Sequence, residues 1–326
     1  MTKVLTYTSK HLISKYNMII YIINMVKVEL TERDEEKQLS TKDFHLNVPF
    51  PNKHHSKDKD KPTKEKTALY VPRNELVKNN LFKSSSFSPK VKVTRNVTNI
   101  LETIFKYGNI AKRYGENGLE MDPTRQQIII YSVIVCQNNL LWYQRATPET
   151  AGTDRKKFLG DLRLQGKQSV GFGGHKTEDD IGLSNAELTF LQDLLPAIKD
   201  QLAVLVGLNK GFFTEIEEEL GINRGNIKDI KFLGAFFDER LEDPSIEIQV
   251  GWVHTGIATI IELDPETTTK LHFHTRETAK AWWVPFDKVF EELNHKMKVA
   301  QQGKGPLVES WTETMIKEFW SDYYSK

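Results

Sequence analysis

The sequence predicts an α/β sandwich built on a mixed sheet, preceded by a disordered N-terminal appendage. Two observations carry this prediction. Runs of β-branched and aromatic residues alternate with segments whose apolar residues recur every three or four positions, a mixture typical of α/β folds. Residues 53–66 are mostly Lys, His, Asp and Glu with almost no apolar side chain, so they cannot bury enough surface to offset the entropy lost on ordering.

The 326 residues are expected to form three parts: a disordered leader and linker at 1–66, an extension packed on the main domain at 67–125, and the main domain at 126–326. The apolar run at 18–23 is far shorter than the roughly 20 residues of a membrane span. It is interrupted by Asn24 and lacks a small-residue cleavage site, so we interpret it as a short strand of the leader. His54 and His55 offer metal ligands, but a linker is the preferred interpretation.

The elements expected from Thr67 onward follow from local patterns. Two β-branched runs at 127–135 and 140–143, separated by Asn138-Asn139, predict a hairpin. Apolar spacing of three and four residues predicts a helix at 188–205, with a break at Pro196. The remaining expectations are a strand at 68–71, a Ser-rich turn at 84–88, a helix at 97–107, a polar insertion at 146–160, strands at 230–237 and 246–263, and helices at 279–298 and 307–324.

Charge and cysteine content exclude several classes of protein. The formal net charge is +1, which gives no overall electrostatic attraction to nucleic acid or an anionic membrane. Cys136 is the only cysteine, so no intrachain disulfide forms, and its apolar neighbours indicate a buried side chain, not a nucleophile. We therefore expect a cytoplasmic protein with a small-molecule partner, without nucleic acid or membrane binding. Its oligomeric state stays open.

The stretch from Thr214 to Ile222 carries the strongest chemical signal. In a helix, Glu215, Glu218 and Glu219 lie on one face, while Glu217 points elsewhere. Adjacent like charges destabilise a helix, and a hard divalent cation with oxygen ligands would offset their repulsion. A solvated acidic face is the alternative.

Upstream, an apolar run ends in the turn Gly173-Gly174-His175. Together with the glutamate helix, this turn resembles the signature of the Nudix hydrolase superfamily. Glu215, Ile216, Glu218, Glu219, Gly221 and Ile222 fall in register with that signature. Asp180 occupies the place of its first glutamate, after a much longer gap than usual before the helix, and Thr214 replaces its arginine. Lys210 or Arg224 are candidate substitutes for that arginine, although a lysine lacks the planar guanidinium fork.

The resemblance extends from roughly Ala68 to the C-terminus, because further short motifs occur in the order found in one subgroup of the family. These motifs are Glu120-Met121-Asp122-Pro123, the Gln-rich strand from Gln126, Arg163-Leu164-Gln165-Gly166-Lys167, the segment Val250–Gly256, and Glu309-Ser310-Trp311-Thr312.

The resemblance implies a Nudix-type α/β/α sandwich that hydrolyses a nucleoside diphosphate linked to another group. It implies Mg²⁺ or Mn²⁺ held by Glu215, Glu218, Glu219 and the carbonyl of Gly174. These three glutamates are the expected catalytic residues, and which one acts as the base stays open. A bound ion activates the attacking water and orients the phosphates.

Four residues are candidate contacts to substrate phosphate: Arg145, Arg163, Lys167 and His175. Arginine binds phosphate in a bidentate manner, but surface arginines and structurally hydrogen-bonded histidines are common. Two other functions remain open. Thr214 and the long insertion before the helix favour a Nudix-fold module that binds a nucleotide or a protein without turnover. An isomerase of isoprenoid diphosphates would need a cysteine facing the cleft, whereas Cys136 lies in an apolar run.

Overall fold

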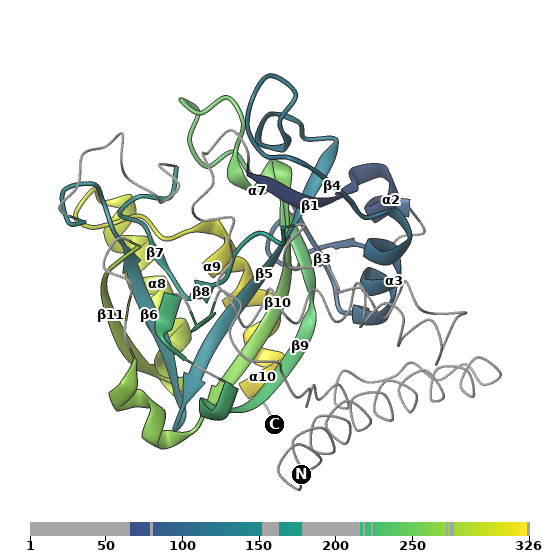
Figure 1. Cartoon of the computed structure of the whole chain (residues 1–326). Coiled ribbons are helices and arrows are strands. Elements are labelled where there is room, and N and C mark those ends of the chain that lie inside the picture. The colour runs from purple at the N-terminus through teal and green to yellow at the C-terminus, as the bar shows by residue number, and fades with distance from the viewer. Residues whose placement is uncertain are drawn as a thin grey trace, which may run out of the picture. The chain divides into compact units, whose positions relative to one another are not determined.

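The computed structural model describes residues 66–78, 81–151, 163–177, 216–217, 219–222, 224–271, 273 and 277–324. Within these residues an eleven-stranded mixed sheet has the main order β11-β6-β5-β10-β9-β3-β2 (Figure 1). Its strands are β1 (Thr67–Pro72), β2 (Lys83–Ser84), β3 (Val91–Thr94), β4 (Asn109–Lys112), β5 (Arg125–Cys136), β6 (Asn139–Arg145), β7 (Gln168–Ser169), β8 (Gly171–Phe172), β9 (Ile227–Asp238), β10 (His254–Leu263) and β11 (Thr278–Pro285).

Short helices connect and cover the strands. They are α2 (Arg73–Val77), α3 (Val97–Tyr107), η4 (Leu119–Met121), η6 (Arg224–Asn226), α7 (Val250–Val253), η7 (Pro265–Lys270), η8 (Phe286–Lys288), α8 (Val289–Gln301), α9 (Ser310–Thr314), the π-helix η9 (Met315–Trp320) and α10 (Ser321–Tyr324). None of the described helices has the length and apolar character needed to cross a lipid bilayer.

The centre of the sheet is the parallel pair β5 and β10, in which His254 lies opposite Gln127. Antiparallel strands flank this pair, with β9 beside β10 and β6 joined to the end of β5. The sheet is therefore mixed, which confirms the predicted fold class. β1 pairs with β5, so residues from the predicted extension at 67–125 and the predicted main domain at 126–326 share one sheet. Both ranges lie in the same unit of the chain, at 55–326.

The hairpin of β5 and β6 forms where the sequence predicts it, with a turn shifted by one residue. Gln137 and Asn138 are its two central residues, and both have positive φ, 48° and 61°. Two-residue hairpin turns of this kind match the twist of the strands, and asparagine tolerates the conformation better than most side chains.

Both faces of the central strands are buried. Tyr131, Val133 and Val135 on one face of β5 belong to a core cluster that includes Met315, Ile316, Phe319 and Trp320 from the C-terminal helical segment. Alternate residues on the opposite face, Ile128, Ile130 and Ile134, are also at most 1% exposed. Strands buried on both faces are expected to be nearly continuous apolar runs, as β5 is. Cys136 is buried at the end of β5, as predicted.

The expected strand at 246–263 begins only at His254, so its first part was wrongly predicted. The side chain of Gln249 is the physical reason. It accepts hydrogen bonds from the backbone N–H groups of Glu242 and Asp243 and donates to the carbonyls of Asp243 and Ile246. These bonds fold the segment into a loop, and the helical turn α7 follows it.

The helix expected at 279–298 is wrong over its first part, where β11 pairs with β6. Trp282 stacks on Trp142 of β6, with ring centroids 6.4 Å apart, and this pairing requires the extended backbone. Pro285 ends the strand, and α8 begins at Val289.

The helix predicted at 97–107 and the helical segment at 307–324 are confirmed, the latter beginning at Ser310. The leader, most of the insertion at 146–160 and the expected helix at 188–205 lie outside the described residues.

Candidate functional site

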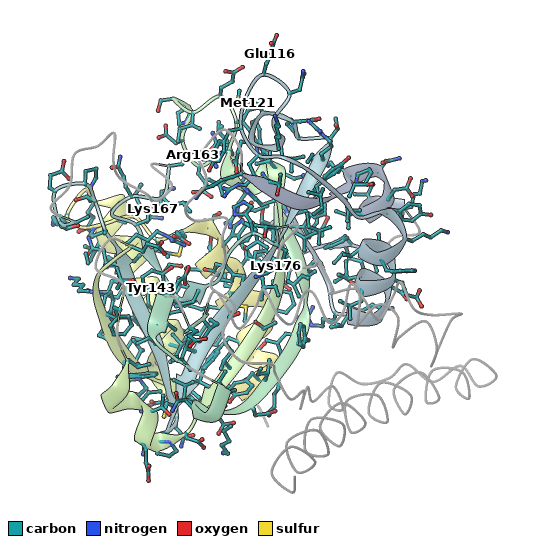
Figure 2. The ribbon with its side chains drawn as sticks, viewed as in Figure 1. Glu116, Met121, Tyr143, Arg163, Lys167 and Lys176 are labelled. Carbon is teal, nitrogen blue, oxygen red and sulfur yellow. The ribbon has the colours of Figure 1, made fainter. Side chains whose placement is uncertain are left out.

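Three motifs far apart in the sequence meet at one end of β5. Glu120 lies in η4, which precedes β5, and His254 begins β10 directly after α7. Gln126 joins these segments, because its amide donates to the carbonyl of Trp252 at 2.6 Å and its oxygen accepts from the hydroxyl of Thr255 at 3.2 Å. Figure 2 labels two residues at this end of the molecule: Met121, which follows Glu120 in the sequence, and Arg163.

The loop after β8 brings His175 to this end. His175 forms a bridge with Ile129 of β5, and the carbonyl of Lys176 accepts from the N–H of Leu69 in β1 at 2.6 Å. The loop is thus fixed between two strands, and the His175 ring meets the His254 ring edge-on with centroids 5.0 Å apart.

Glu120, His175 and His254 form a candidate metal-binding group, with their ligand atoms all within 4.8 Å of one another. The Nε2 atoms of the two histidines are 2.9 Å apart. Oε1 of Glu120 is 3.7 Å from Nε2 of His175 and 3.6 Å from Nε2 of His254. Glu120 and His254 are buried, and the side chain of His175 is 18% exposed.

Two arginines contact the carboxylate of this group. Arg113 donates to Oε1 of Glu120 at 3.0 Å, and Arg163 donates to Oε2 at 2.6 Å. Burial alone would raise the pKa of Glu120, but the facing histidines and Arg113 lower it far below the usual range. Burial and the neighbouring Arg113 lower the pKa of His175 well below its usual value. Near neutral pH the group therefore holds an ionised carboxylate and a neutral His175.

The glutamate helix and the glycine turn also meet. Residues 216, 217, 219 and 220 are helical, with Ile216 and Leu220 fully buried and Glu217 exposed, as the predicted helix face requires. The backbone N–H of Gly173 donates to Oε2 of Glu219 at 3.2 Å. Gly173 has φ +130°, and a Cβ there would lie 2.1 Å from the carbonyl oxygen of Ile130, so only glycine fits this turn.

Arg145, predicted to bind phosphate, lies in a network of polar side chains. Its Nε donates to Glu309, whose other oxygen accepts from the hydroxyl of Ser169 at 2.9 Å. Burial alone would lower the pKa of Arg145, but Glu309, Tyr143 and Glu219 raise it well above its usual value. The network continues to Tyr131, whose hydroxyl is 3.1 Å from both Ser169 Oγ and Thr312 Oγ1.

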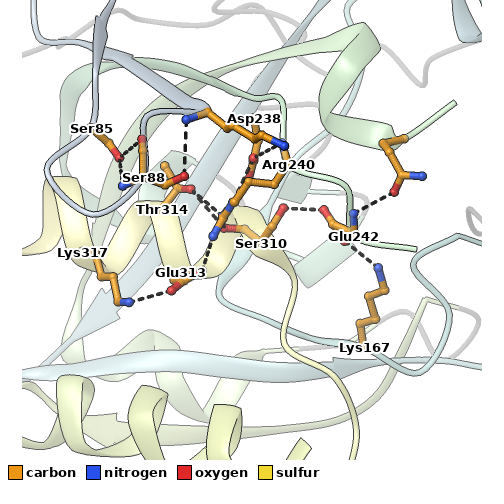
Figure 3. Close-up of polar contacts among 12 residues, drawn as sticks. Ser85, Ser88, Lys167, Asp238, Arg240, Glu242, Ser310, Glu313, Thr314 and Lys317 are labelled. Carbon is orange, nitrogen blue, oxygen red and sulfur yellow. Dashed lines mark hydrogen bonds and ion pairs between the residues drawn. The ribbon is translucent and has the colours of Figure 1, made fainter. Parts of the chain in front are cut away.

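Lys167 and Arg163, also predicted to contact substrate, have carboxylate partners as well. Lys167 donates to Glu242 at 2.7 Å, and Glu242 accepts in turn from the hydroxyl of Ser310 (Figure 3). Arg163 binds Glu120, as described above. Contact of these cations with substrate therefore stays a prediction.

Several predicted residues lie outside the described part of the chain: Glu215, Glu218, Thr214, Asp180, Lys210 and the side chain of Arg224. Gly174 is described and lies directly between Gly173 and His175.

The grouping of Glu120 and His254 with His175 was not predicted from the sequence. All three residues occur in recognisable motifs, but 55 and 79 residues separate His175 from Glu120 and His254. Candidate ligands with such irregular spacing leave no local signature, because the fold and not their spacing brings them together.

No family model matches this sequence. Protein YmaB of Bacillus subtilis is 32% identical over 146 residues, which are 45% of this chain and 53% of that protein, so the aligned part spans about half of the relative. The structure of Tm1382, a proposed Nudix hydrolase, is similar with a TM-score of 0.42 at 17% identity, over 76% of this chain and 94% of that one. DR0079 from Deinococcus radiodurans is similar with a TM-score of 0.34 at 10% identity, over 63% of this chain and 90% of that one. Likenesses this distant assign no role to any residue of this chain.

Proposed function

We propose that this protein hydrolyses a phosphoanhydride bond in a nucleoside diphosphate linked to another group. Glu215, Glu218 and Glu219 are the proposed ligands of Mg²⁺ or Mn²⁺, together with the carbonyl of Gly174. The bound ion would activate water and stabilise the charge that develops on the phosphate during attack.

The observation that carries this proposal is the hydrogen bond from the Gly173 N–H to Glu219. It joins two parts of the sequence that are 46 residues apart and that together make up the expected site. The proposed ligand atoms suit a hard cation, because carboxylate and carbonyl oxygens are the ligands that Mg²⁺ prefers. The buried aliphatic side chains of Ile216, Leu220 and Ile222 anchor the helix that presents the carboxylates.

Arg145 has a supporting role in this proposal. Thr214 replaces the arginine of the family signature, and Glu219 is among the groups that raise the pKa of Arg145 in β6. We infer that Arg145, held in place by Glu309, supplies positive charge near Glu219. A guanidinium fixed by a buried carboxylate is preorganised, so little reorganisation is needed during the reaction.

The test is hydrolysis of a panel of nucleoside diphosphate derivatives by the full chain, with Mg²⁺ or Mn²⁺ as the added ion. The variants are Glu218→Gln and Glu219→Gln, with Glu217→Gln as the matched control, because Glu217 lies on the same helix and is exposed. We expect metal-dependent turnover that falls by about 100-fold or more in the first two variants and is unchanged in the control.

Two outcomes would contradict the proposal. Turnover that is equal in all three variants would place the reaction elsewhere in the molecule. Absence of turnover on every substrate, with nucleotide binding retained, would instead support a Nudix-fold binding module, the alternative that Thr214 favours.

A further inference from the structure

The arrangement of Glu120, His175 and His254 has the dimensions of a metal site. The three facing atoms form a triangle with sides of 2.9, 3.7 and 3.6 Å. The point equidistant from all three lies about 2.0 Å from each, which is the usual bond length from zinc to histidine nitrogen or carboxylate oxygen. Two histidines and one glutamate are also an established set of protein ligands for zinc.

The hydrogen bonding of His254 directs a lone pair to this point. Its Nδ1 is 2.7 Å from the carbonyl oxygen of Val250, and a carbonyl only accepts, so Nδ1 carries the proton. The Nε2 of a neutral His254 is then unprotonated and faces His175. Histidines that bind metals commonly donate their other N–H to a backbone carbonyl, which fixes the ring and raises the basicity of the ligating nitrogen.

Without a metal, the 2.9 Å separation between the two Nε2 atoms requires a proton on His175 Nε2. A cation that replaces this proton would meet two imidazole nitrogens and one carboxylate oxygen with little movement of the rings. The backbone supports this geometry, because His254 begins β10 and His175 is bridged to β5.

The surrounding charge selects the kind of ion. Arg113 and Arg163 hold Glu120 ionised, and a ligating carboxylate is commonly hydrogen-bonded in this way. Their positive charges also weaken the binding of every cation. The ion must therefore bind these ligands strongly, and imidazole suits Zn²⁺ and its transition-metal neighbours, whereas Mg²⁺ prefers carboxylate, carbonyl and water oxygens.

We propose that Glu120, His175 and His254 bind a transition-metal ion, Zn²⁺ foremost, at a site distinct from the glutamate ligands of the proposed hydrolase. The site would fix the loop after β8, since His175 directly follows Gly174, and water or another ligand would complete the coordination. Zinc binding is measured without any substrate, so its outcome does not depend on whether the protein is a hydrolase.

The experiment measures the binding of Zn²⁺ to the metal-free full chain by competition with a chromophoric chelator, and the visible spectrum with Co²⁺ as a probe. The test variants are Glu120→Gln and His175→Ala. One control is His295→Ala, at an exposed position on α8, and the second is the pair His54→Ala and His55→Ala, which removes the adjacent histidines near the N-terminus.

We expect one tightly bound Zn²⁺ per chain and a tetrahedral or five-coordinate Co²⁺ spectrum. The affinity for Zn²⁺ should fall at least about 10-fold in both test variants and stay unchanged in both controls. Wild-type protein without tight Zn²⁺ binding would overturn the proposal, as would the same affinity and Co²⁺ spectrum in wild type and test variants. Loss of binding in the His54/His55 control would place the ion near the N-terminus and would also overturn it.

A second measurement needs no substitution and is decisive if a test variant fails to fold. Histidines of the wild-type protein are modified with diethyl pyrocarbonate and mapped by mass spectrometry, with and without Zn²⁺. The proposal predicts that Zn²⁺ protects His175, which is partly exposed, and leaves the modification of His295 unchanged. Equal modification of His175 under both conditions would contradict it.

Discussion

At the scale of single residues, the candidate sites depend on a few charged side chains and on one glycine. Substitution of these residues would introduce a steric clash or leave a buried charge without its partner. Gly173 is the clearest case, because its backbone conformation and its contact with Ile130 both exclude a Cβ atom. The N–H of this same residue binds Glu219. A change in the shape of the turn therefore moves a proposed metal ligand.

We predict that Gly173→Ala abolishes turnover and lowers the free energy of unfolding. Gly115→Ala is the matched control: Gly115 has φ +105°, but a Cβ at this position would have no neighbouring atom within 4 Å. Backbone strain alone costs about 1–3 kcal/mol, and only Gly173→Ala adds a steric clash. Urea unfolding and initial rates measure both effects. Equal losses of stability in the two variants would show that the structure relieves the clash between the new Cβ and Ile130 without an energetic cost.

The pair of Arg145 and Glu309 gives a second prediction at this scale. The Glu309 side chain is 5% exposed, so Arg145→Met leaves a buried carboxylate without its cation. We expect a loss of about 3–5 kcal/mol in the free energy of unfolding. Lys288→Met is the control, because Lys288 and Glu291 are both well exposed and an ion pair in solvent contributes little to stability. Adding Glu309→Gln to Arg145→Met should recover part of the stability; a further loss would contradict this account.

At the scale of helices and strands, the sequence predicted correctly those elements that are determined by their own local residue pattern. The hairpin of β5 and β6 and the helix α3 follow from β-branched runs and helical spacing. The first part of the expected helix at 279–298 is a strand because Trp282 stacks on Trp142, a residue about 140 positions earlier. The start of the expected strand at 246–263 is a loop because one side chain, Gln249, binds four backbone groups. Neither cause is visible in a local pattern.

The turn of the hairpin offers a stabilising change. Asn138 has φ 61°, a conformation that glycine adopts without steric cost. We predict that Asn138→Gly raises the free energy of unfolding by up to about 1 kcal/mol and leaves turnover unchanged. Asn139→Gly is the control and should be destabilising, because Asn139 lies within β6 and pairs with Cys136. Denaturant unfolding of both variants measures the difference, and destabilisation by Asn138→Gly would disprove the assigned turn.

The helical segment after Glu309 is expected to contribute most to the free energy of unfolding through its packing against the sheet. Phe319 is fully buried against Phe236 of β9, whereas Phe290 on α8 is 41% exposed. We predict that Phe319→Ala costs about 3–5 kcal/mol and that Phe290→Ala costs far less. Thermal and urea unfolding of both variants would test this prediction. Similar losses of stability in the two variants would mean that η9 does not pack in the core against the sheet.

At the scale of the whole molecule, the two candidate sites differ in how their residues are brought together. The proposed metal ligands of the glutamate helix could be predicted from the sequence, because they are neighbours on one predicted helix face. The grouping of Glu120, His175 and His254 could not, because it depends on the parallel pairing of β5 with β10 and on the bridge from His175 to Ile129. Long-range strand order is not encoded in any single segment.

The same topology predicts how much of the chain is needed for folding. Among the described residues the sheet begins at Thr67, and β1 contributes the buried residues Ala68, Leu69 and Val71 as well as its pairing with β4 and β5. A variant that starts at Lys61 retains all of these contacts. We predict that its free energy of unfolding stays within about 0.5 kcal/mol of the full chain. All six tryptophans lie beyond residue 140, so their fluorescence during urea unfolding reports the sheet.

A second truncation, starting at Arg73, removes β1 and is the informative contrast. Burying each of its large apolar side chains contributes about 1.5–3 kcal/mol, and β4 loses its only strand partner among the described residues. We therefore expect the second variant to unfold at a much lower urea concentration or to fail to fold, and to lose turnover because Leu69 binds the loop that carries His175. If the variant starting at Lys61 were destabilised as strongly as the one starting at Arg73, residues before the sheet would be part of the folding unit, and the predicted boundary near residue 66 would be wrong.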